Sequence, residues 1–336
     1  MGSDRRFSVV VTAYDQRRLL PDTLNAVLAQ SPAPHEVVLV DDGSTDDTSR
    51  MVEDRYGERV RMMRVANGGD LAARNAGLAR MTGELVAFCD GDHLWQPDFL
   101  AHMAALWQAE PRIGAAFADF RLLRDGTPSA GTKFDDAPAD FWTGLRAIGP
   151  GLAVFDAPVV ERVIGFQPFL PSCMVVERSF FVGLGGWDVS VGRMVGADLA
   201  TILLLAEHTP FGVVRKPLVG IREDDGDQSS DMQAMHLRDA AILEHLLARR
   251  PSVAKLRPVI EASVARRRAE ALDLAFARGD HAAVMNIWRQ LPKAVRAWPR
   301  WAKAQSAALP NALRKPVVRG LLALGAWRES VGRTGG

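Results

Sequence analysis

Short β-rich runs alternate with helical patterns through the first hundred residues, and no other feature of the sequence constrains the fold as strongly. The predicted strands span residues 7–13, 36–42, 59–65 and 84–90. Helical periodicity of the apolar residues lies between them, at 17–30, 46–56 and 70–81. Strands separated by helices of this length form right-handed βαβ crossovers. The sequence therefore predicts an α/β fold with a Rossmann-like, mostly parallel sheet that helices cover on both faces.

Clusters of polar residues follow three of these strands. They are Thr12-Ala13-Tyr14-Asp15, Asp41-Asp42-Gly43-Ser44 and Asp90-Gly91-Asp92-His93. In sheets of this kind, ligands bind at the carboxyl ends of the strands, where the loops converge. We therefore expect the three clusters to lie along one edge of the sheet and to form a binding site there.

Asp90 and Asp92 place two carboxylates close together at the end of an apolar strand. Hard divalent cations prefer oxygen ligands and keep waters and substrate phosphates as the rest of their coordination shell. The pair therefore suits a site for a metal and a diphosphate. The alternative is a structural role, because a helix begins near Pro97 and carboxylates often cap helices. The triplet alone leaves both interpretations open, and His93 beside it is more typical of a hydrogen-bonding neighbour than of a ligand.

A carboxylate in the second cluster, at Asp42, is placed to accept hydrogen bonds from a base or a ribose. Taken alone, this cluster is better explained as an Asx turn in which Ser44 or Asp46 caps the next helix. Arg74 and Asn75 follow on a predicted helix that faces the same cleft. Arg74 is suited to pair with a phosphate and Asn75 to fix the backbone of a neighbouring loop, whereas the alternative is a surface salt bridge.

The remainder of the chain divides at about Ser230. Before that point the pattern predicts a strand at 113–122, a helix near 138–147, a strand at 172–178, a helix capped by Ser179, a helix near 197–208 and a strand near 211–221. After that point the sequence is almost entirely helical. Two helices within 271–290 are predicted to join at Gly279-Asp280.

Charge is divided unevenly along a chain of 336 residues. Residues 231–336 hold 19 Lys and Arg against 8 Asp and Glu, and the preceding residues hold 22 against 32. Only two cysteines occur, Cys89 and Cys173, and they are not closely spaced, so neither a disulfide framework nor a cysteine-based zinc site is indicated. No apolar run of 18 residues is present. These features indicate a globular protein of the cytoplasm.

Four segments in this order and spacing, VVVTAYD, VLVDDGSTD, NGGDLAARNAGL and FCDGDHLWQPDFL, strongly resemble family 2 glycosyltransferases of the A-type (GT-A) fold. The later segments PSCMVVERSFFVGLGGWDVSVG and GADLATILLLAEH resemble the acceptor half of the same family. The resemblance covers about residues 5–230. It implies a catalytic domain over 1–230, with a nucleotide-binding half at about 5–110 and an acceptor half at about 111–230. A basic helical region over 231–336 would follow it.

The resemblance also implies roles for single residues. Asp198 matches the catalytic base, and Asp92 matches the metal-binding residue of the D-x-D motif, with Asp90 as the accompanying carboxylate. Trp187 and Asp188 are candidate acceptor contacts, although a Trp after two glycines is equally typical of a core residue. The residues implied to bind the donor nucleotide are Thr12, Ala13, Tyr14, Asp42, Arg74, Asp90 and Gly91.

Three positions depart from the pattern of the family. Ala197 stands where the family usually has Glu, so one acidic group near the acceptor is absent. Asp15 replaces the usual Asn after Tyr14. Asp224 and Asp227 stand where many members carry a His and an Asn, which leaves the third metal ligand to Asp224 or to water.

The resemblance implies an inverting transfer of a sugar from a nucleoside diphosphate sugar, with UDP favoured, to the hydroxyl of a glycan, a lipid-linked or a small-molecule acceptor. Mn²⁺ or Mg²⁺ would assist. The alternatives are an inactive nucleotide- or carbohydrate-binding scaffold, since Ala197 replaces an acid, and a nucleotidyltransferase, which VTAYDQRRLL disfavours because it lacks a Gly-rich loop.

The basic C-terminal region allows two interpretations. Its composition suits the interface of an anionic bilayer, which would place the protein peripherally on the inner face of a membrane. The alternative is a solvated helical face packed on the catalytic domain. No aromatic-basic module for nucleic acid is present. The residues concerned are Lys293, Arg296, Trp298, Arg300, Trp301, Lys303, Arg314, Lys315, Arg319 and Trp327.

Overall fold

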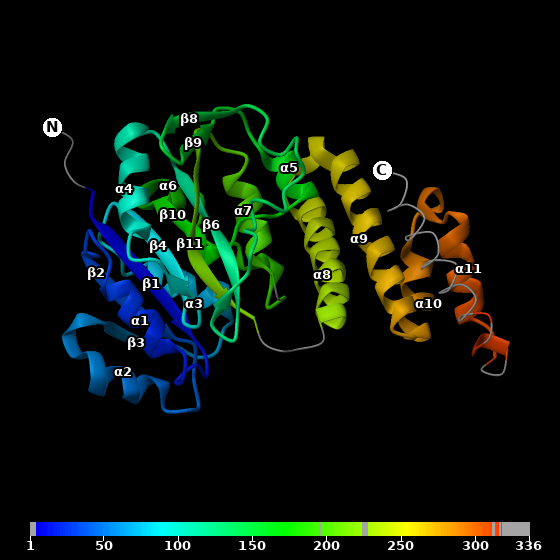
Figure 1. Ribbon diagram of the computed structural model, residues 1–336, viewed down its shortest axis with the longest axis horizontal. Helices are drawn as coiled ribbons and strands as arrows, with labels where there is room; N and C mark the ends of the chain where they lie inside the picture. Colours follow the sequence, from blue (N-terminus) through cyan, green and yellow to red (C-terminus); the bar gives the residue numbers. More distant parts are fainter. Residues whose placement is uncertain (1–4, 195, 224–227, 311–312, 316, 318–336) are drawn as a thin grey trace. The chain divides into compact units, whose positions relative to one another are not determined.

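The computed structural model describes residues 5–194, 196–223, 228–310, 313–315 and 317. The chain divides into two compact units, Met1–Asp224 and Asp225–Gly336. The first unit contains every strand of the described residues, and the described part of the second contains helices alone (Figure 1).

Four parallel strands form the first half of the sheet, in the order β3-β2-β1-β4. The helices α1, α2 and α3 connect them, as the alternation in the sequence predicts, and Figure 1 shows these strands side by side in blue and cyan. The bounds are β1 Phe7–Ala13, α1 Leu20–Leu28, β2 Glu36–Asp41, α2 Thr48–Tyr56, β3 Arg61–Arg64, α3 Asp70–Leu78 and β4 Leu85–Asp90.

The second half of the sheet is mixed. β10 runs antiparallel to both of its neighbours, β4 and β6, while β11 runs parallel to β6. β9 and β8 then complete the edge in antiparallel pairs. The predicted parallel arrangement therefore holds for β1 to β4 and not for the whole sheet. The bounds are β6 Ala115–Arg124, β8 Leu145–Gly149, β9 Leu152–Phe155, β10 Met174–Glu177 and β11 Phe211–Arg222, with the short strands β5 Leu94–Trp95 and β7 Thr127–Pro128 beside them.

Alternating side chains of β1 separate the two faces of the sheet. Val9 and Val11 belong to a core that includes residues of α1, α2 and α4 (Phe99–Ala109). Val10 points to the other face, where α3 crosses so closely that a Cβ on Gly77 would lie 2.4 Å from Val10 Cγ1. Only glycine allows that approach, so Gly77 fixes the distance of α3 from the sheet. Cys89 and Cys173 are both buried and free.

Two local predictions are wrong. Residues 138–147 do not form a helix, because Phe141 and Trp142 pack against Phe169 and Phe155 and hold the segment in turns that lead into β8. The helix α6 (Arg178–Gly183) is capped by Glu177 and not by Ser179. The Glu177 carboxylate accepts the Phe180 N–H at 2.6 Å and also the Ser179 hydroxyl.

Two further helices of the first unit are α5 (Val160–Gly165) and α7 (Asp198–Leu205). The second unit is built from α8 (Gln228–Arg249), α9 (Arg257–Ala277), α10 (His281–Gln290) and α11 (Trp298–Ala307). The predicted joint between α9 and α10 is confirmed: Gly279 has φ +74°, and Asp280 caps α10 by accepting the Ala283 N–H. Among the described residues, no helix combines the length and the apolar character that crossing a membrane requires.

Candidate functional site

A buried ion pair lies at the carboxyl end of β4. Arg74 Nη2 on α3 donates to Asp90 Oδ1 at 2.6 Å, with side-chain exposures of 6% and 22%. Burial opposes both charges, but Arg74 first and then His93 hold the pKa of Asp90 below its ordinary value. Burial likewise acts to lower the pKa of Arg74, whereas Asp90, Asp70 and Asp198 together raise it. Both groups are therefore charged at neutral pH.

The loop and helix that carry Arg74 are fastened at two points. The carboxylate of Asp42 accepts the backbone N–H groups of Gly68 and Gly69 at 2.8 and 2.9 Å, just before α3 begins. Asn75 makes two hydrogen bonds to the backbone of Trp187, one through each end of its amide. Asn75 thus fixes a neighbouring loop, as predicted, and Asp42 holds the loop in front of Arg74.

The Asp90-Gly91-Asp92 turn fits tightly between its neighbours. Thr12 Oγ1 donates to Asp90 Oδ1 at 3.3 Å. A Cβ on Gly91 would lie 2.4 Å from Gln16 Oε1 and 3.0 Å from the Thr12 carbonyl oxygen, so a larger residue would displace the Gln16 side chain and crowd that carbonyl group. The turn therefore presents its two carboxylates in one fixed arrangement.

His93 lies between those carboxylates. Its Nδ1 is 3.6 Å from Asp90 Oδ2, and its Nε2 is 3.7 Å from Asp92 Oδ1. Nδ1 also lies 2.7 Å from Ser172 Oγ, which accepts the backbone N–H of Asp90. Sequence reasoning did not identify Ser172, since it lies just before β10, which becomes a neighbour of β4 only through antiparallel pairing.

The acidic residues of the turn suit a divalent cation that a bound diphosphate helps to hold. Asp92 has a side chain that is 31% exposed, and Arg222 donates to its backbone carbonyl at 2.9 Å, which orients the residue. Among the described residues, no three His, Cys, Asp or Glu side chains are grouped as a complete metal site. One or two carboxylates with waters and a diphosphate form the set that Mg²⁺ commonly uses. Asp224, the predicted third ligand, lies outside the described residues.

The end of β1 leads into an exposed segment. Tyr14 is 47% exposed, whereas Ala13 before it is buried. Asp15 links this segment to the loop after β2, because Oδ1 accepts the Thr45 N–H and the Asp15 N–H donates to Ser44. The Tyr14 ring is therefore accessible to a ligand, although hydrogen bonds of Asp15 hold the loop that carries it.

A cavity of about 400 Å³ joins the ion pair to Asp198. Asp198 is the first residue of α7 and lines this cavity together with Asp90 and Arg74. Asp70 and Arg193 line it as well, and sequence reasoning missed both. Asp70 had a local signal, since it opens α3 directly after Gly68-Gly69. Arg193 had none, because its position depends on hydrogen bonds to the distant Asn67.

Trp187 is a core residue. It is 1% exposed, and its ring packs edge to face against Phe88 and Phe181 with the Arg74 guanidinium 5.1 Å from its centre. The structure therefore corrects the prediction of stacking on an acceptor, because the buried ring offers no accessible face. Asp188 caps the following turn by accepting the Ser190 N–H at 3.0 Å.

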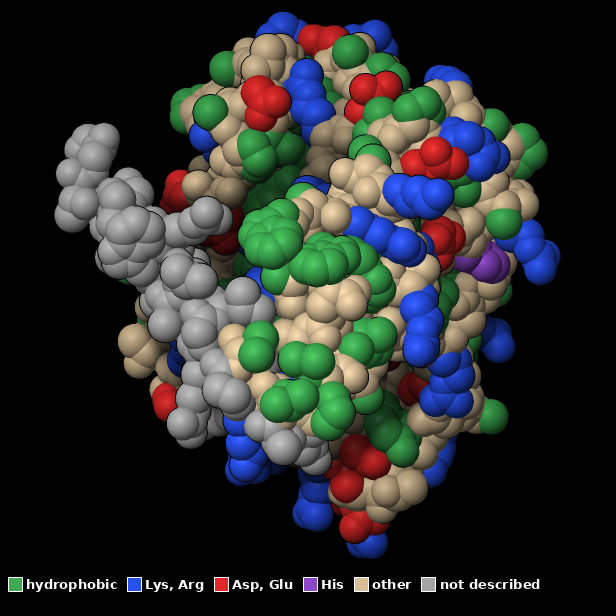
Figure 2. All heavy atoms as spheres, turned by 90° about the vertical axis from the view of Figure 1, so that its right-hand side faces the viewer, with side chains coloured by type: hydrophobic (Ala, Val, Ile, Leu, Met, Phe, Trp, Pro, Cys, Tyr) green, Lys and Arg blue, Asp and Glu red, His purple; other side chains and the backbone are tan. Residues whose placement is uncertain are grey.

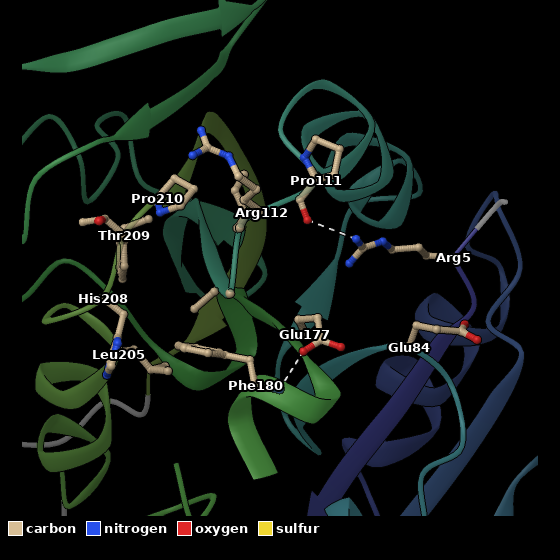
Figure 3. A pocket seen from close by; sticks show the side chains of 14 residues that line it. Arg5, Glu84, Pro111, Arg112, Glu177, Phe180, Leu205, His208, Thr209 and Pro210 are labelled. Atoms are coloured by element: carbon tan, nitrogen blue, oxygen red, sulfur yellow. Dashed lines mark hydrogen bonds between the residues drawn. The ribbon is translucent and has the colours of Figure 1, made fainter. Parts of the chain in front are cut away.

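A second cavity, of about 580 Å³, lies at the opposite edge of the sheet (Figure 3). Residues around the amino ends of parallel strands line it, such as Arg5 before β1 and Phe211 at the start of β11. Its polar groups bond to the protein itself: Arg5 donates to the Pro111 carbonyl oxygen, and Glu177 caps α6. The first cavity, and not this one, is lined by Asp90 and Asp198.

Comparison with known sequences identifies a family. Residues 8–130 match the sequence model described as Glycosyl transferase family 2. An uncharacterized glycosyltransferase of Nostoc sp. is 37% identical over 112 residues, which cover 32% of this chain and 35% of that protein. A Bacillus subtilis protein, provisionally named teichuronic acid biosynthesis glycosyltransferase TuaG, is 35% identical over 135 residues. That match covers 39% of this chain and 52% of TuaG, so the chain spans about half or less of these relatives.

Solved structures share the fold. TarS residues 1–349 from S. aureus, in complex with UDP-GlcNAc, align with a TM-score of 0.56 at 17% identity and cover 94% of this chain and 92% of TarS 1–349. The mannosyltransferase PcManGT of Pyrobaculum calidifontis, in complex with GDP-Man and Mn²⁺, aligns with a TM-score of 0.53 at 21% identity and covers 96% of this chain and 86% of PcManGT. Residues 8–130 therefore match glycosyl transferase family 2, and the chain has a GT-A-type fold.

Proposed function

We propose that the protein transfers a sugar, with inversion, from a nucleoside diphosphate sugar to the hydroxyl group of an acceptor, by one direct displacement. One observation carries the proposal: Asp90 and Asp198, from distant parts of the sequence, line the same cavity as Arg74. UDP is the proposed nucleotide, and a glycan, a lipid-linked molecule or a small natural product is the proposed acceptor.

Asp198 acts as the general base in this scheme. The acceptor hydroxyl gives its proton to the Asp198 carboxylate while its oxygen attacks the anomeric carbon. The bond between that carbon and the diphosphate breaks at the same time, and the nucleoside diphosphate leaves. No covalent enzyme intermediate forms, so the configuration at the anomeric carbon inverts.

The remaining residues bind and orient the donor. Asp92 would hold Mn²⁺ or Mg²⁺ with the accompanying Asp90, and the bound ion would supply Lewis-acid stabilisation of the charge on the leaving diphosphate. Arg74 holds Asp90 in place by the 2.6 Å ion pair. Thr12, Ala13, Tyr14, Asp42 and Gly91 form the proposed nucleotide wall.

A screen of nucleotide sugars for Mn²⁺-dependent hydrolysis tests the proposal. At least one donor is expected to release its nucleoside diphosphate in the presence of the protein and Mn²⁺. The anomer released in the first seconds, followed by NMR, should be inverted. Nucleotide binding without hydrolysis or transfer would instead support an inactive binding scaffold.

The variant Asp198→Asn tests the assigned base. Turnover should fall by about a hundredfold or more, the scale typical of losing a general base, while the donor affinity changes little. Near-normal turnover would remove Asp198 from the mechanism. Glu207→Gln, just beyond α7 and outside the proposed site, serves as the matched control.

We also propose that α11 contacts an anionic membrane surface. Trp298 and Trp301 are 69% and 43% exposed, and their rings stack with centroids 5.2 Å apart. Figure 2 shows hydrophobic side chains beside Lys and Arg side chains on the side of the molecule where α10 and α11 lie. Exposed Trp beside cations is typical of helices that lie in a membrane interface.

The cations near the tryptophans divide into two groups. Arg300 and Lys303 are paired with Asp273 on α9. Lys293 and Lys315 are exposed, and within the described part of the chain neither has an ion pair. Flotation with anionic vesicles should carry the protein upward, and the variant Trp298→Ala/Trp301→Ala should remain at the bottom. Equal flotation of both proteins would contradict the contact.

A further inference from the structure

Asp70 is a carboxylate of the cavity that the proposed mechanism does not use. It is the first residue of α3 and lines the cavity of about 400 Å³ together with Asp90 and Asp198. Its side chain makes no hydrogen bond to any residue that the structure describes. Burial raises the pKa of Asp70, as do the nearby carboxylates, while Arg74 acts to lower it. The carboxylate is thus partly enclosed without a fixed partner.

Among the described residues, neither guanidinium group at the cavity is hydrogen-bonded to Asp70, although Arg74 attracts it. Of the two guanidinium groups that line it, Arg193 donates to the carbonyl oxygen of Asn67 and to its side chain. Arg74 is committed to Asp90 at 2.6 Å. Three carboxylates therefore share the cavity with two guanidinium groups whose donors are largely engaged. The wall around Asp70 is acidic and rich in hydrogen-bond acceptors.

Arg74 supplies a second and independent sign of a ligand. Its side chain is 6% exposed, and its Nε is buried without a hydrogen-bond partner among the described residues. A buried N–H without a partner costs free energy in the unliganded protein and is usually satisfied by a ligand or by water. Arg74 therefore carries a buried donor beside the cavity, and Asp70 offers an acceptor to whatever enters it.

Resting on the proposed function, we propose that Asp70 selects the sugar of the donor. Its carboxylate accepts hydrogen bonds from hydroxyl or amide N–H groups of a neutral sugar. A uronate donor would place its own carboxylate against this acidic wall, where like charges at a few ångströms repel. Neutral hexoses and N-acetylated hexoses are therefore accepted, and sugars with a carboxylate are rejected.

Donor titration by isothermal calorimetry in the presence of Mn²⁺ tests this proposal. UDP, UDP-glucose, UDP-GlcNAc and UDP-glucuronate are each titrated into the wild type, into Asp70→Asn and into Asp70→Ser, which keeps a polar residue at the start of the helix. Glu161→Gln is the matched control, because Glu161 is an exposed acid in the first turn of α5, away from the cavity. Melting temperatures of all variants establish that each is folded.

The readout is the ratio of the dissociation constants for the uronate donor and for the better neutral donor. The wild type and Glu161→Gln should bind the neutral donor at least about tenfold more tightly. In Asp70→Asn this preference should fall about tenfold, while the affinity for UDP alone changes by less than about twofold. An unchanged preference in both Asp70 variants, or a wild type that prefers the uronate, would overturn the assignment.

The titration would give a different result if the proposed function itself were wrong. A folded wild type that binds neither UDP nor any UDP-sugar would contradict the proposed function, and the role of Asp70 with it. A wild type that binds UDP normally, with a preference that does not depend on Asp70, would contradict the role of Asp70 alone.

Discussion

Two buried guanidinium–carboxylate pairs, one in each unit, have the same N–O distance. The pKa shifts of the first pair favour the charged forms, whereas those of the second favour the neutral forms. Arg74–Asp90 in the cleft and Arg267–Asp239 between α9 and α8 both measure 2.6 Å, and both arginines are 6% exposed. In the first pair, the pKa values of both groups shift toward the charged forms. In the second pair, burial raises the pKa of Asp239 and lowers that of Arg267, toward the neutral forms.

The difference lies in what surrounds each pair. Further carboxylates act on Arg74, and His93 and Ser172 act on Asp90, so charge is stabilised in the cleft. For Arg267, burial outweighs the attraction to Asp239 and lowers the pKa of the guanidinium. We infer that the first pair is part of a charged binding site, whereas the second links two helices at little net gain in stability.

The largest effect is expected for Arg267→Met. The change leaves Asp239 buried without its cation, which typically costs about 3–5 kcal/mol. Urea unfolding followed by circular dichroism measures it. Arg257→Met, in an exposed pair with Glu261 on the same helix, should cost less than about 1 kcal/mol. Similar losses for the two variants would contradict the comparison.

Arg74→Lys should affect function more than stability. Lysine keeps the charge but lacks the planar fork that holds Asp90. Turnover of the donor should fall by about 10- to 100-fold, the range for losing a hydrogen bond between charged groups. Thermal melting should change little by comparison. Normal turnover would show that the geometry of the Arg74–Asp90 pair is unimportant.

Acid should remove the contribution of Asp90 only at low pH. Because the pKa of Asp90 is lowered in the folded protein, its stabilisation is complete above the ordinary value of about 4 and is lost as the pH falls below it. The difference in melting temperature between the wild type and Asp90→Asn should therefore stay constant from pH 7 to about pH 4 and then narrow. A difference that narrows well above pH 4 would contradict the assigned charge state.

The smallest net effect is expected when both members of the second pair become apolar. Asp239→Leu combined with Arg267→Met removes the cost of burying two charges, and such replacements are often neutral or stabilising. The double variant should unfold within about 1 kcal/mol of the wild type or at higher urea. A loss as large as that of Arg267→Met alone would show that the ion pair itself stabilises the helices.

The structure of residues 5–110 was predictable because its signals are local. Alternating apolar runs predict β1 to β4. The parallel arrangement then predicts that the polar residues after these strands lie along one edge of the sheet. The charge state of the cleft was not predictable in the same way. Arg74 was assigned to a phosphate from its helix alone, whereas its 2.6 Å contact with Asp90 depends on how closely Gly77 lets α3 approach the sheet.

Residues 111–230 were harder to predict because their structure depends on distant contacts. β10 pairs antiparallel with β4 and β6, and no short segment carries that information. Residues 138–147 have helical periodicity, but aromatic contacts to Phe155 and Phe169 override it. The burial of Trp187 was not predictable either, because the glycine-rich turn before it gave no sign that the ring packs in the core.

Calorimetric titration of UDP and GDP into the protein, with and without Mn²⁺, tests the central claim most directly. One nucleotide should bind with a dissociation constant of about 1 mM or tighter in Mn²⁺. Asp92→Ala should abolish the effect of the metal on this affinity. Asp136→Ala should not, because Asp136 is an exposed acid outside the site. No binding of either nucleotide by the folded protein, or the same metal-dependent binding in Asp92→Ala, would contradict the claim that this edge of the sheet holds a metal and a nucleoside diphosphate.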